Sequence, residues 1–114
     1  MRCFDERPWG RWEEYLDESG YRLKRLIILP GCRLSLQKHN KRNEHWIVVR
    51  GLGTAIIGSE EFRLSPGATH FVPIGAIHRL QSDEGAEPLE IIEVQTGVCD
   101  EDDIVRIEDD WGRT

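Results

Sequence analysis

The chain has 114 residues, of which 39% are apolar and 32% charged, and its net charge is −6. This length fits one domain, and it is enough for a core that needs no disulfide bridges. A negative balance argues against general binding to nucleic acids or anionic membranes, which requires surplus positive charge. We therefore expect neither a nucleic-acid partner nor a membrane partner.

The charges are unevenly distributed along the chain. Eleven of the 15 lysines and arginines lie in residues 2–50, whereas 12 of the 21 acidic residues lie in residues 83–110. The basic half leaves room for one local anion site, such as a phosphate site. The three cysteines form no CxxC pair, and the charged first 20 residues lack the apolar run of a signal peptide. We expect a cytoplasmic protein without a disulfide framework.

Short β-strand patterns separated by glycine or proline turns follow one another along the chain. We expect strands in residues 21–29, 33–39, 45–50, 54–58, 61–64, 68–73, 76–82 and 89–97. Such a series, without a 3.6-residue period, indicates an antiparallel sandwich or barrel. A polar loop is expected at 83–87, and a helical turn only in the acidic tail, residues 100–114.

Strand alternation brings together several side chains that can bind a metal. Gln37 and His39 are two residues apart and share one face of their strand. The short loop that follows can fold Glu44 back beside them, whereas His45 points to the opposite face. His78, which follows a proline–glycine turn, is the candidate for the fourth group. Gln37, His39, Glu44 and His78 would form a mixed nitrogen and oxygen site.

This donor set fits a borderline divalent cation. Zinc is the first choice, followed by manganese, iron, cobalt or nickel. A thiolate metal site does not fit. Because an amide oxygen is a poor ligand, we expect moderate affinity and at least one open position for water or substrate.

The same residues have the spacing of the cupin motifs. The first motif reads Gly31, Gln37, His39, Glu44 and Gly51, and the second reads Gly67, Pro73, Gly75, His78 and Ser82. The chain thus resembles the cupin superfamily, with glutamine for the first histidine and serine for the final asparagine. The resemblance implies an all-β double-stranded β-helix, or jelly-roll barrel. One domain would span residues 1–114, with an N-terminal arm or strand (1–20), the barrel (21–97) and an acidic C-terminal segment (98–114).

A closer resemblance covers nearly the whole chain. The segments RPWG, YRLKR, RLSLQKH, EHWIVV, IHRL, EIIEVQTG and EDDIVRIEDDWGR look like the cupin domain of type II mannose-6-phosphate isomerases. That family implies a zinc set of Gln, His, Glu and His, which matches the glutamine at position 37. Lys38, Asn40 and Lys41 depart from the family's usual residues. The guanylyltransferase domain that usually precedes this domain has no room in the chain, so transferase activity is not implied.

The implied reaction interconverts mannose 6-phosphate and fructose 6-phosphate through a cis-enediol. The metal would polarise the sugar oxygens. Arg79 and Lys24 are catalytic candidates that could grip the phosphate, and Glu93 is the candidate for proton transfer. Arg25 and Gln95 are candidates for binding the substrate.

Other readings of the sequence stay open. A non-catalytic, metal-containing module that binds a sugar or sugar phosphate has the same fold, as does an oxygenase acting on a small molecule. Exposed edge strands and tryptophans favour a homodimer that shares a sheet.

Overall fold

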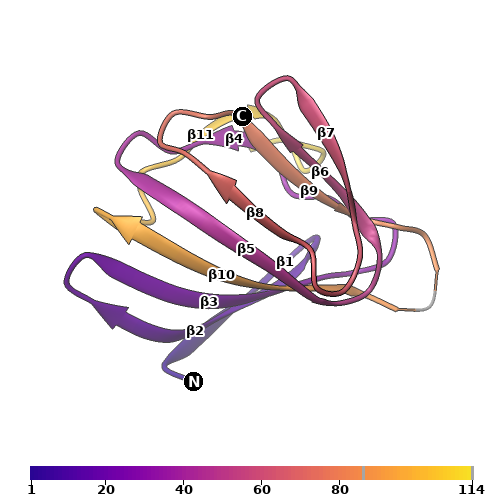
Figure 1. Cartoon of the computed structure of the whole chain (residues 1–114), viewed down its shortest axis with the longest axis horizontal. Helices are drawn as coiled ribbons and strands as arrows, with labels where there is room; N and C mark the ends of the chain where they lie inside the picture. Colours follow the sequence, from indigo (N-terminus) through magenta and orange to yellow (C-terminus); the bar gives the residue numbers. More distant parts are fainter. Residues whose placement is uncertain (86, 114) are drawn as a thin grey trace.

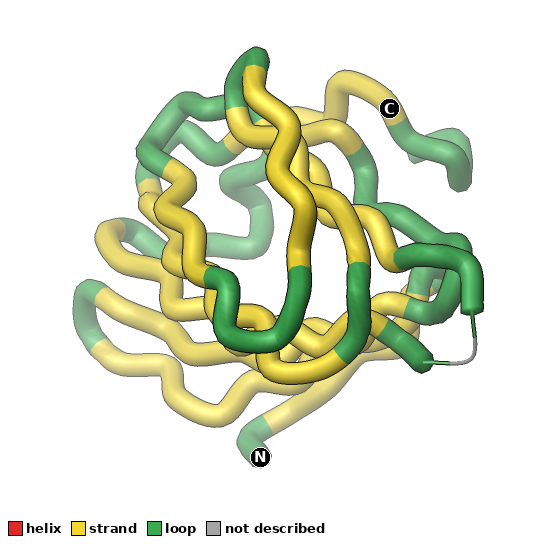
Figure 2. Tube along the Cα trace, turned by 45° about the vertical axis from the view of Figure 1, so that its right-hand side comes forward, coloured by secondary structure: helices red, strands yellow, loops and turns green. Residues whose placement is uncertain are grey.

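The computed structural model describes residues 1–85 and 87–113, which form eleven strands and no helix (Figures 1 and 2). In chain order the strands are β1 (Cys3–Arg7), β2 (Gly10–Glu18), β3 (Tyr21–Ile28), β4 (Leu36–Lys38), β5 (Arg42–Arg50), β6 (Gly53–Ile57), β7 (Glu60–Leu64), β8 (Thr69–Val72), β9 (His78–Ser82), β10 (Leu89–Gly97) and β11 (Val105–Glu108). No helix capable of crossing a membrane is found in these residues. Residue 86 of the expected loop 83–87 and residue 114 of the expected C-terminal segment lie outside the described residues.

The strands form two antiparallel sheets, so the expected all-β fold is confirmed. One sheet has the order β1-β2-β3-β10-β5-β8, and the other has the order β11-β4-β9-β6-β7. Residues 1–20 contribute the β1–β2 hairpin to the edge of the larger sheet. The helical turn expected in the acidic tail is wrong for its described part. The tail instead makes a turn at residues 101–102 and then strand β11, which pairs with β4.

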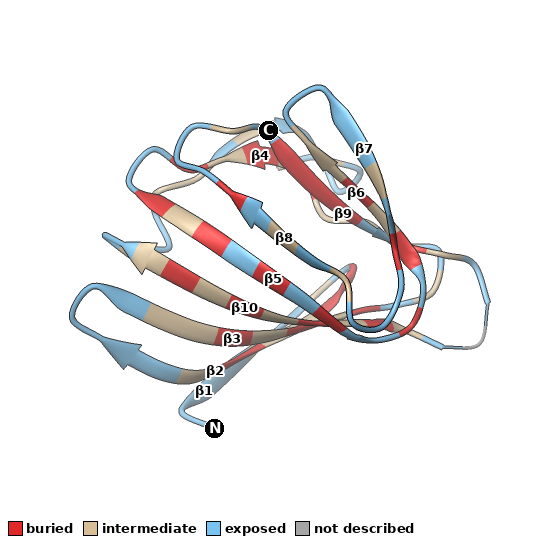
Figure 3. Cartoon of the chain, viewed as in Figure 1, coloured by how far each residue is buried: buried red, intermediate tan, exposed pale blue. Residues whose placement is uncertain are grey.

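Buried and exposed residues alternate along the strands, as Figure 3 shows for β5. The inward apolar side chains form a core between the sheets. Apolar members of this core come from both sheets and include Ile28, Val48, Leu64, Leu80 and Ile91. All three cysteines are free, so the core is built without disulfide bridges.

The inward face of each long strand changes from apolar to polar along its length. On β10, Leu89 and Ile91 are buried in the apolar core, whereas Glu93 and Gln95 are buried further along the same face. Strands β3 and β5 make the same change in register with β10, with Lys24 opposite Glu93 and Glu44 opposite Gln95. One end of the interior is therefore packed with hydrocarbon, and the other end is a polar cavity.

A glycine turn links the two halves of the metal motif. Gly75 has a φ of +82°, a left-handed conformation that favours glycine because it has no Cβ. Its N–H donates to the carbonyl oxygen of His39 at 2.8 Å. The turn that precedes His78 is thereby fixed against the residue that follows β4.

Candidate metal centre and cavity

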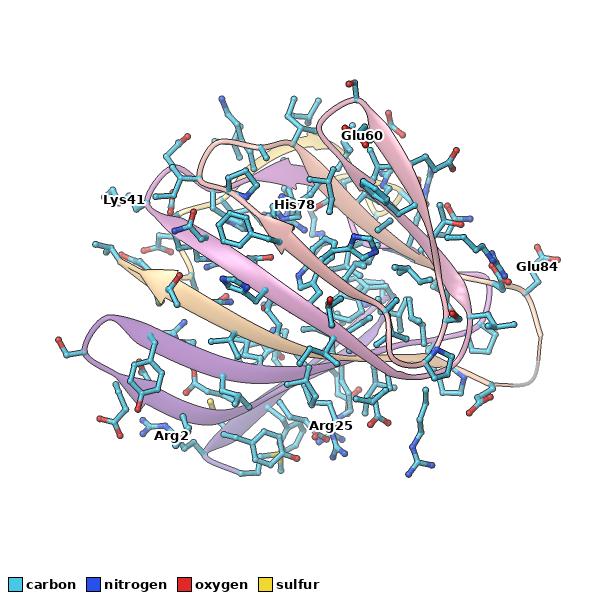
Figure 4. The ribbon with its side chains drawn as sticks, viewed as in Figure 1. Arg2, Arg25, Lys41, Glu60, His78 and Glu84 are labelled. Carbon is cyan, nitrogen blue, oxygen red and sulfur yellow. The ribbon has the colours of Figure 1, made fainter. Side chains whose placement is uncertain are left out.

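Three side chains from three different strand regions converge at the polar end of the interior. His39 follows β4, Glu44 lies on β5 and His78 begins β9, and all three are buried. Their ligand atoms lie within 4.8 Å of one another. The His39 Nε2 atom is 3.1 Å and the His78 Nε2 atom 3.6 Å from the carboxylate oxygens of Glu44. In Figure 4, His78 lies between the two sheets.

The ring orientation of both histidines suits metal binding. The Nδ1 atom of His39 is 2.6 Å from the carbonyl oxygen of Asp103, and that of His78 is 2.9 Å from the carbonyl oxygen of Ala76. A carbonyl only accepts a hydrogen bond, so Nδ1 carries the proton and Nε2 of the neutral ring keeps its lone pair. Burial lowers the pKa of His78, which favours its neutral form. Both Nε2 atoms face Glu44.

Gln37 completes the set that could surround a cation. It lies directly opposite His78 in the pairing of β4 with β9, and it is buried against the same cavity. Its Nε2 donates to the carbonyl oxygen of Ser35 at 3.4 Å, which leaves the amide oxygen as its free end. Two imidazole nitrogens, one carboxylate and one amide oxygen fit zinc or another borderline divalent ion.

Arg42 lies next to this cluster and competes for its ligand atoms. Its Nε and Nη2 atoms donate to Glu44 Oε2 at 3.0 and 2.9 Å, and Nη2 is 3.2 Å from Nε2 of His39. A neutral imidazole nitrogen has one lone pair. A metal ion and Arg42 therefore cannot both use Nε2 of His39.

Glu44 and Glu93 are two buried carboxyl groups whose pKa values are shifted in opposite directions. Burial, assisted by the charge of Glu44 and a hydrogen bond to it, raises the pKa of Glu93 from 4.5 to about 8. Burial would also raise the pKa of Glu44, but the neighbouring His39, His78, Glu93 and Arg42 hold it well below 4.5. At neutral pH the pair thus holds one proton, and that proton is on Glu93.

The cluster opens into a cavity of about 390 Å³, and part of its lining, here called the basic wall, consists of arginines. Four arginines line that wall: Arg7, Arg79, Arg106 and Arg113. Burial and the positive charges of Arg113 and Arg7 lower the pKa of Arg106. The Nε atom of Arg106 is buried and has no hydrogen-bond partner among the described residues. Arg113 is ion-paired with Asp109 and Arg7 with Asp5, so the unused donor of Arg106 is the feature that best suits an anionic ligand.

Comparison with known proteins agrees with these observations. The model of the mannose-6-phosphate isomerase C-terminal family matches residues 2–109. The chain belongs to this family. The resemblance that the sequence motifs indicated is therefore confirmed.

Curated relatives of this family member are longer proteins. The xanthan biosynthesis protein XanB of Xanthomonas campestris is 45% identical over 109 residues, which are 95% of this chain and 23% of XanB. A mannose-1-phosphate guanylyltransferase of Escherichia coli is 40% identical over 108 residues, or 94% of this chain and 23% of that protein. The chain thus spans less than a quarter of the length of these relatives.

Solved structures confirm the cupin fold. The cupin-2 domain protein Rru_A2000 of Rhodospirillum rubrum superposes with a TM-score of 0.70 at 17% identity, covering 80% of this chain and 62% of that one. At this identity the likeness concerns the fold alone.

Two of the predicted phosphate-binding residues reach the cavity but have partners there. Arg79 is buried, and it donates to the carbonyl oxygen of Leu34 at 2.9 Å and to Glu108 at 3.0 Å. Lys24 is buried and paired with Glu101. Both are thus anchored to neighbouring segments, Lys24 to the acidic C-terminal segment and Arg79 to strand β11.

Arg25 and Gln95, the predicted substrate-binding residues, lie in different places. Arg25 follows Lys24 on β3 and points to the outer face, where it donates to Glu13 at 2.6 Å and where Figure 4 draws it away from the interior. It does not line the cavity, so its prediction as a substrate contact is not kept. Gln95 does line it, and donates to Glu93 at 3.0 Å. The amide oxygen of Gln95 is buried without a partner among the described residues.

Sequence reasoning missed Arg42, Arg7, Arg106 and Arg113. The signal for Arg42 was present, since it alternates with Glu44 along β5 and therefore shares its inward face. The other three come from the two ends of the chain, and no local pattern indicates that these ends meet at the cavity.

Proposed function

We propose that the chain acts as a metal-dependent aldose–ketose isomerase on mannose 6-phosphate and fructose 6-phosphate. The observation that carries this proposal is the position of Glu93. Its carboxyl group, whose pKa burial raises to about 8 in the metal-free protein, lies in one cavity with a metal-competent cluster and a group of arginines. A group that takes and returns a proton works best when its pKa is near the working pH.

The proposed reaction moves one proton between two carbon atoms. Glu93, in its ionised form, takes the proton from C2 of the open-chain aldose, which gives a cis-enediolate with its negative charge on the C1 oxygen, and the proton of the C2 hydroxyl then passes to that oxygen. Glu93 then returns its proton to C1, a carbonyl forms at C2, and the ketose and the ionised carboxylate result. A bound divalent ion supplies Lewis-acid polarisation of the sugar oxygens. Gln37, His39, Glu44 and His78 are the residues that would hold it.

Other residues of the cavity position Glu93 and the substrate. The indole Nε1 of Trp46 donates to Glu93 at 3.1 Å and Gln95 donates to it at 3.0 Å, so both hold its carboxyl group in place. The unpaired amide oxygen of Gln95 can accept a hydrogen bond from a sugar hydroxyl. The phosphate is assigned to Arg106 and its neighbours Arg7 and Arg113, because a guanidinium group matches phosphate geometry.

A second candidate is a sugar-phosphate-binding module without catalysis. It is favoured by Arg42, which neutralises Glu44 and occupies His39 in a way that stabilises the site without a metal ion. The oxygenase alternative shares the set of two histidines and one carboxylate. It gives no role to Glu93 or to the arginines, and we do not favour it.

An activity screen separates the two candidates. The protein is stripped with a chelator, loaded separately with zinc, manganese, cobalt or nickel, and assayed with mannose 6-phosphate in a coupled assay. The isomerase proposal expects turnover with at least one metal and none after stripping. Tight binding of mannose 6-phosphate without turnover under every condition would instead identify a binding module.

We further propose that the protein forms a homodimer through a sheet edge. Strand β8 ends the six-stranded sheet, and Phe71 on β8 and Ile47 on neighbouring β5 are 47% and 44% exposed. An edge strand offers unpaired backbone groups to a second copy. Size-exclusion chromatography with light scattering should give twice the chain mass, and a monomer at all concentrations would contradict the dimer.

A further inference from the structure

The acidic segment between β10 and β11 crosses from one sheet to the other beside the metal cluster. It leaves the six-stranded sheet at Gly97 and joins the five-stranded sheet at Val105, which pairs with Lys38 of β4 (Figure 1). We infer that Asp103 in this segment is a positioning residue, which holds the ring of His39 in the tautomer that the metal site requires. This inference rests on the proposed function for the identity of the site.

Asp103 contacts three consecutive residues at the end of β4. Its backbone oxygen is 2.6 Å from Nδ1 of His39. Its carboxylate oxygens accept hydrogen bonds from the backbone N–H groups of Asn40 and Lys41, both at 2.9 Å. The same residue thus holds the ring through its main chain and the following loop through its side chain.

The side-chain carboxylate of Asp103 sets the position of its backbone carbonyl. Two N–H groups that follow one another along the chain give Asp103 two charge-assisted hydrogen bonds. These bonds fix the position of the side chain and with it the backbone oxygen beside the ring.

The backbone carbonyls that accept a hydrogen bond from Nδ1 of His39 and of His78 lie at different distances along the chain. His78 bonds to the carbonyl of Ala76, two residues away in its own turn. His39 bonds to a carbonyl 64 residues away, so its ring depends on the docking of a remote segment. If Nδ1 lost this acceptor, the neutral ring could carry its proton on Nε2, and that proton would point at Glu44 and block ligation.

Variants of Asp103 test the inference with two readouts. Asp103→Ala removes both side-chain acceptors, and Asp103→Asn replaces one of them by a donor that faces an N–H group. Asp102→Asn is the matched control, because it removes the same charge one position away from an exposed side chain. Nitrogen-15 NMR of the His39 ring, in metal-free protein at a pH where the ring is neutral, reports which nitrogen carries the proton. Zinc affinity is measured by competition with a chromophoric chelator.

We expect the wild type and Asp102→Asn to carry the proton on Nδ1. Asp103→Ala should show the Nε2–H tautomer in a substantial fraction of molecules, and its zinc affinity should fall by about 10- to 100-fold, as is usual when the support of a metal-binding histidine is lost. The Nε2–H fraction and the zinc affinity of Asp103→Asn should lie between those of Asp103→Ala and the wild type. A backbone amide spectrum confirms that each variant is folded.

Two results would overturn the inference. One is a wild-type ring that carries its proton on Nε2, a result that needs no variant. The other is a folded Asp103→Ala protein with the tautomer and zinc affinity of Asp102→Asn. The tautomer is read without metal or substrate, so a protein that never turns over mannose 6-phosphate would count against the proposed isomerase and leave the role of Asp103 intact.

Discussion

Glu44 and Glu93 share one hydrogen-bond donor inside the cavity. The indole Nε1 of Trp46 is 3.3 Å from Glu44 and 3.1 Å from Glu93, which lie on the neighbouring strands β5 and β10. Two buried carboxyl groups this close cannot both be ionised without a large cost. Glu44 is held in the charged form by its cationic surroundings, and Glu93 takes the proton.

Replacing Glu93 by glutamine should remove catalysis and leave the metal site in place. Glutamine has the shape of the protonated carboxyl group but cannot take up a proton. We expect kcat to fall by about 100-fold or more, the usual contribution of a general acid–base group, with zinc affinity nearly unchanged. Glu90→Gln, on the outer face of the same strand, is the control and should keep its activity. A Glu93→Gln enzyme with wild-type kcat would exclude this residue as the base.

The metal-free protein should lose stability as the pH rises through the titration of Glu93. A carboxyl group with a folded pKa near 8 and an ordinary value of 4.5 stabilises the folded state fully below pH 4.5, and this contribution disappears as the pH passes 8. Glu44, with its lowered pKa, acts in the opposite direction and loses its contribution in acid. Urea denaturation in a chelating buffer should show the decline between pH 5 and 8 in the wild type, and Glu93→Gln should flatten it. The same decline in both proteins would contradict this assignment.

Removing Arg42 should weaken the metal-free protein and strengthen metal binding. Arg42→Met leaves the Glu44 carboxylate buried without its main partner, which typically costs about 3–5 kcal/mol. The variant also frees Nε2 of His39 for a metal ion. We therefore expect a lower melting temperature than the wild type with chelator, and a larger rise on adding zinc. Arg63→Met, which breaks an exposed pair with Asp83, should change stability by at most about 1 kcal/mol. A smaller zinc-induced rise in Arg42→Met would show that Arg42 does not compete.

Loss of Arg106 should weaken only the part of substrate binding that depends on the phosphate group. Arg106→Gln removes one guanidinium group from the basic wall of the cavity. A hydrogen bond to a charged group is worth about 1.5–3 kcal/mol, so binding of mannose 6-phosphate should weaken by roughly 10- to 100-fold. Binding of unphosphorylated mannose should be unaffected. Calorimetry with both sugars, on this variant and on Arg63→Gln, makes the comparison, and an equal loss for both sugars would place the phosphate elsewhere.

The candidate metal residues could be predicted because they depend on local rules. Strand alternation alone puts Gln37 and His39 on one inward face, and motif spacing adds Glu44 and His78. The same alternation separates Lys24 from Arg25, because adjacent residues of a strand point to opposite faces. Only Lys24 shares a face with the buried Leu26. Lys24 and Arg25 were both predicted to reach the substrate, but by this rule only one of two adjacent residues can face the cavity.

The arginines of the basic wall and the contact of Asp103 with His39 could not be predicted in this way. Arg106 reaches the cavity because β11 crosses to the second sheet and pairs with β4, and Arg7 arrives with the β1–β2 hairpin. The contact between Asp103 and His39 joins residues 64 positions apart. Such contacts depend on tertiary pairing, which periodicity and turn signals do not specify.

The most direct test of the isomerase follows mannose 6-phosphate by NMR in heavy water with metal-loaded protein. If Glu93 moves the proton between C2 and C1, fructose 6-phosphate should form and carry deuterium at C1, because a carboxyl group in a cavity open to solvent exchanges its proton. Glu93→Gln should give neither signal. Unchanged mannose 6-phosphate with every metal tested, in protein that holds the metal, would contradict the account.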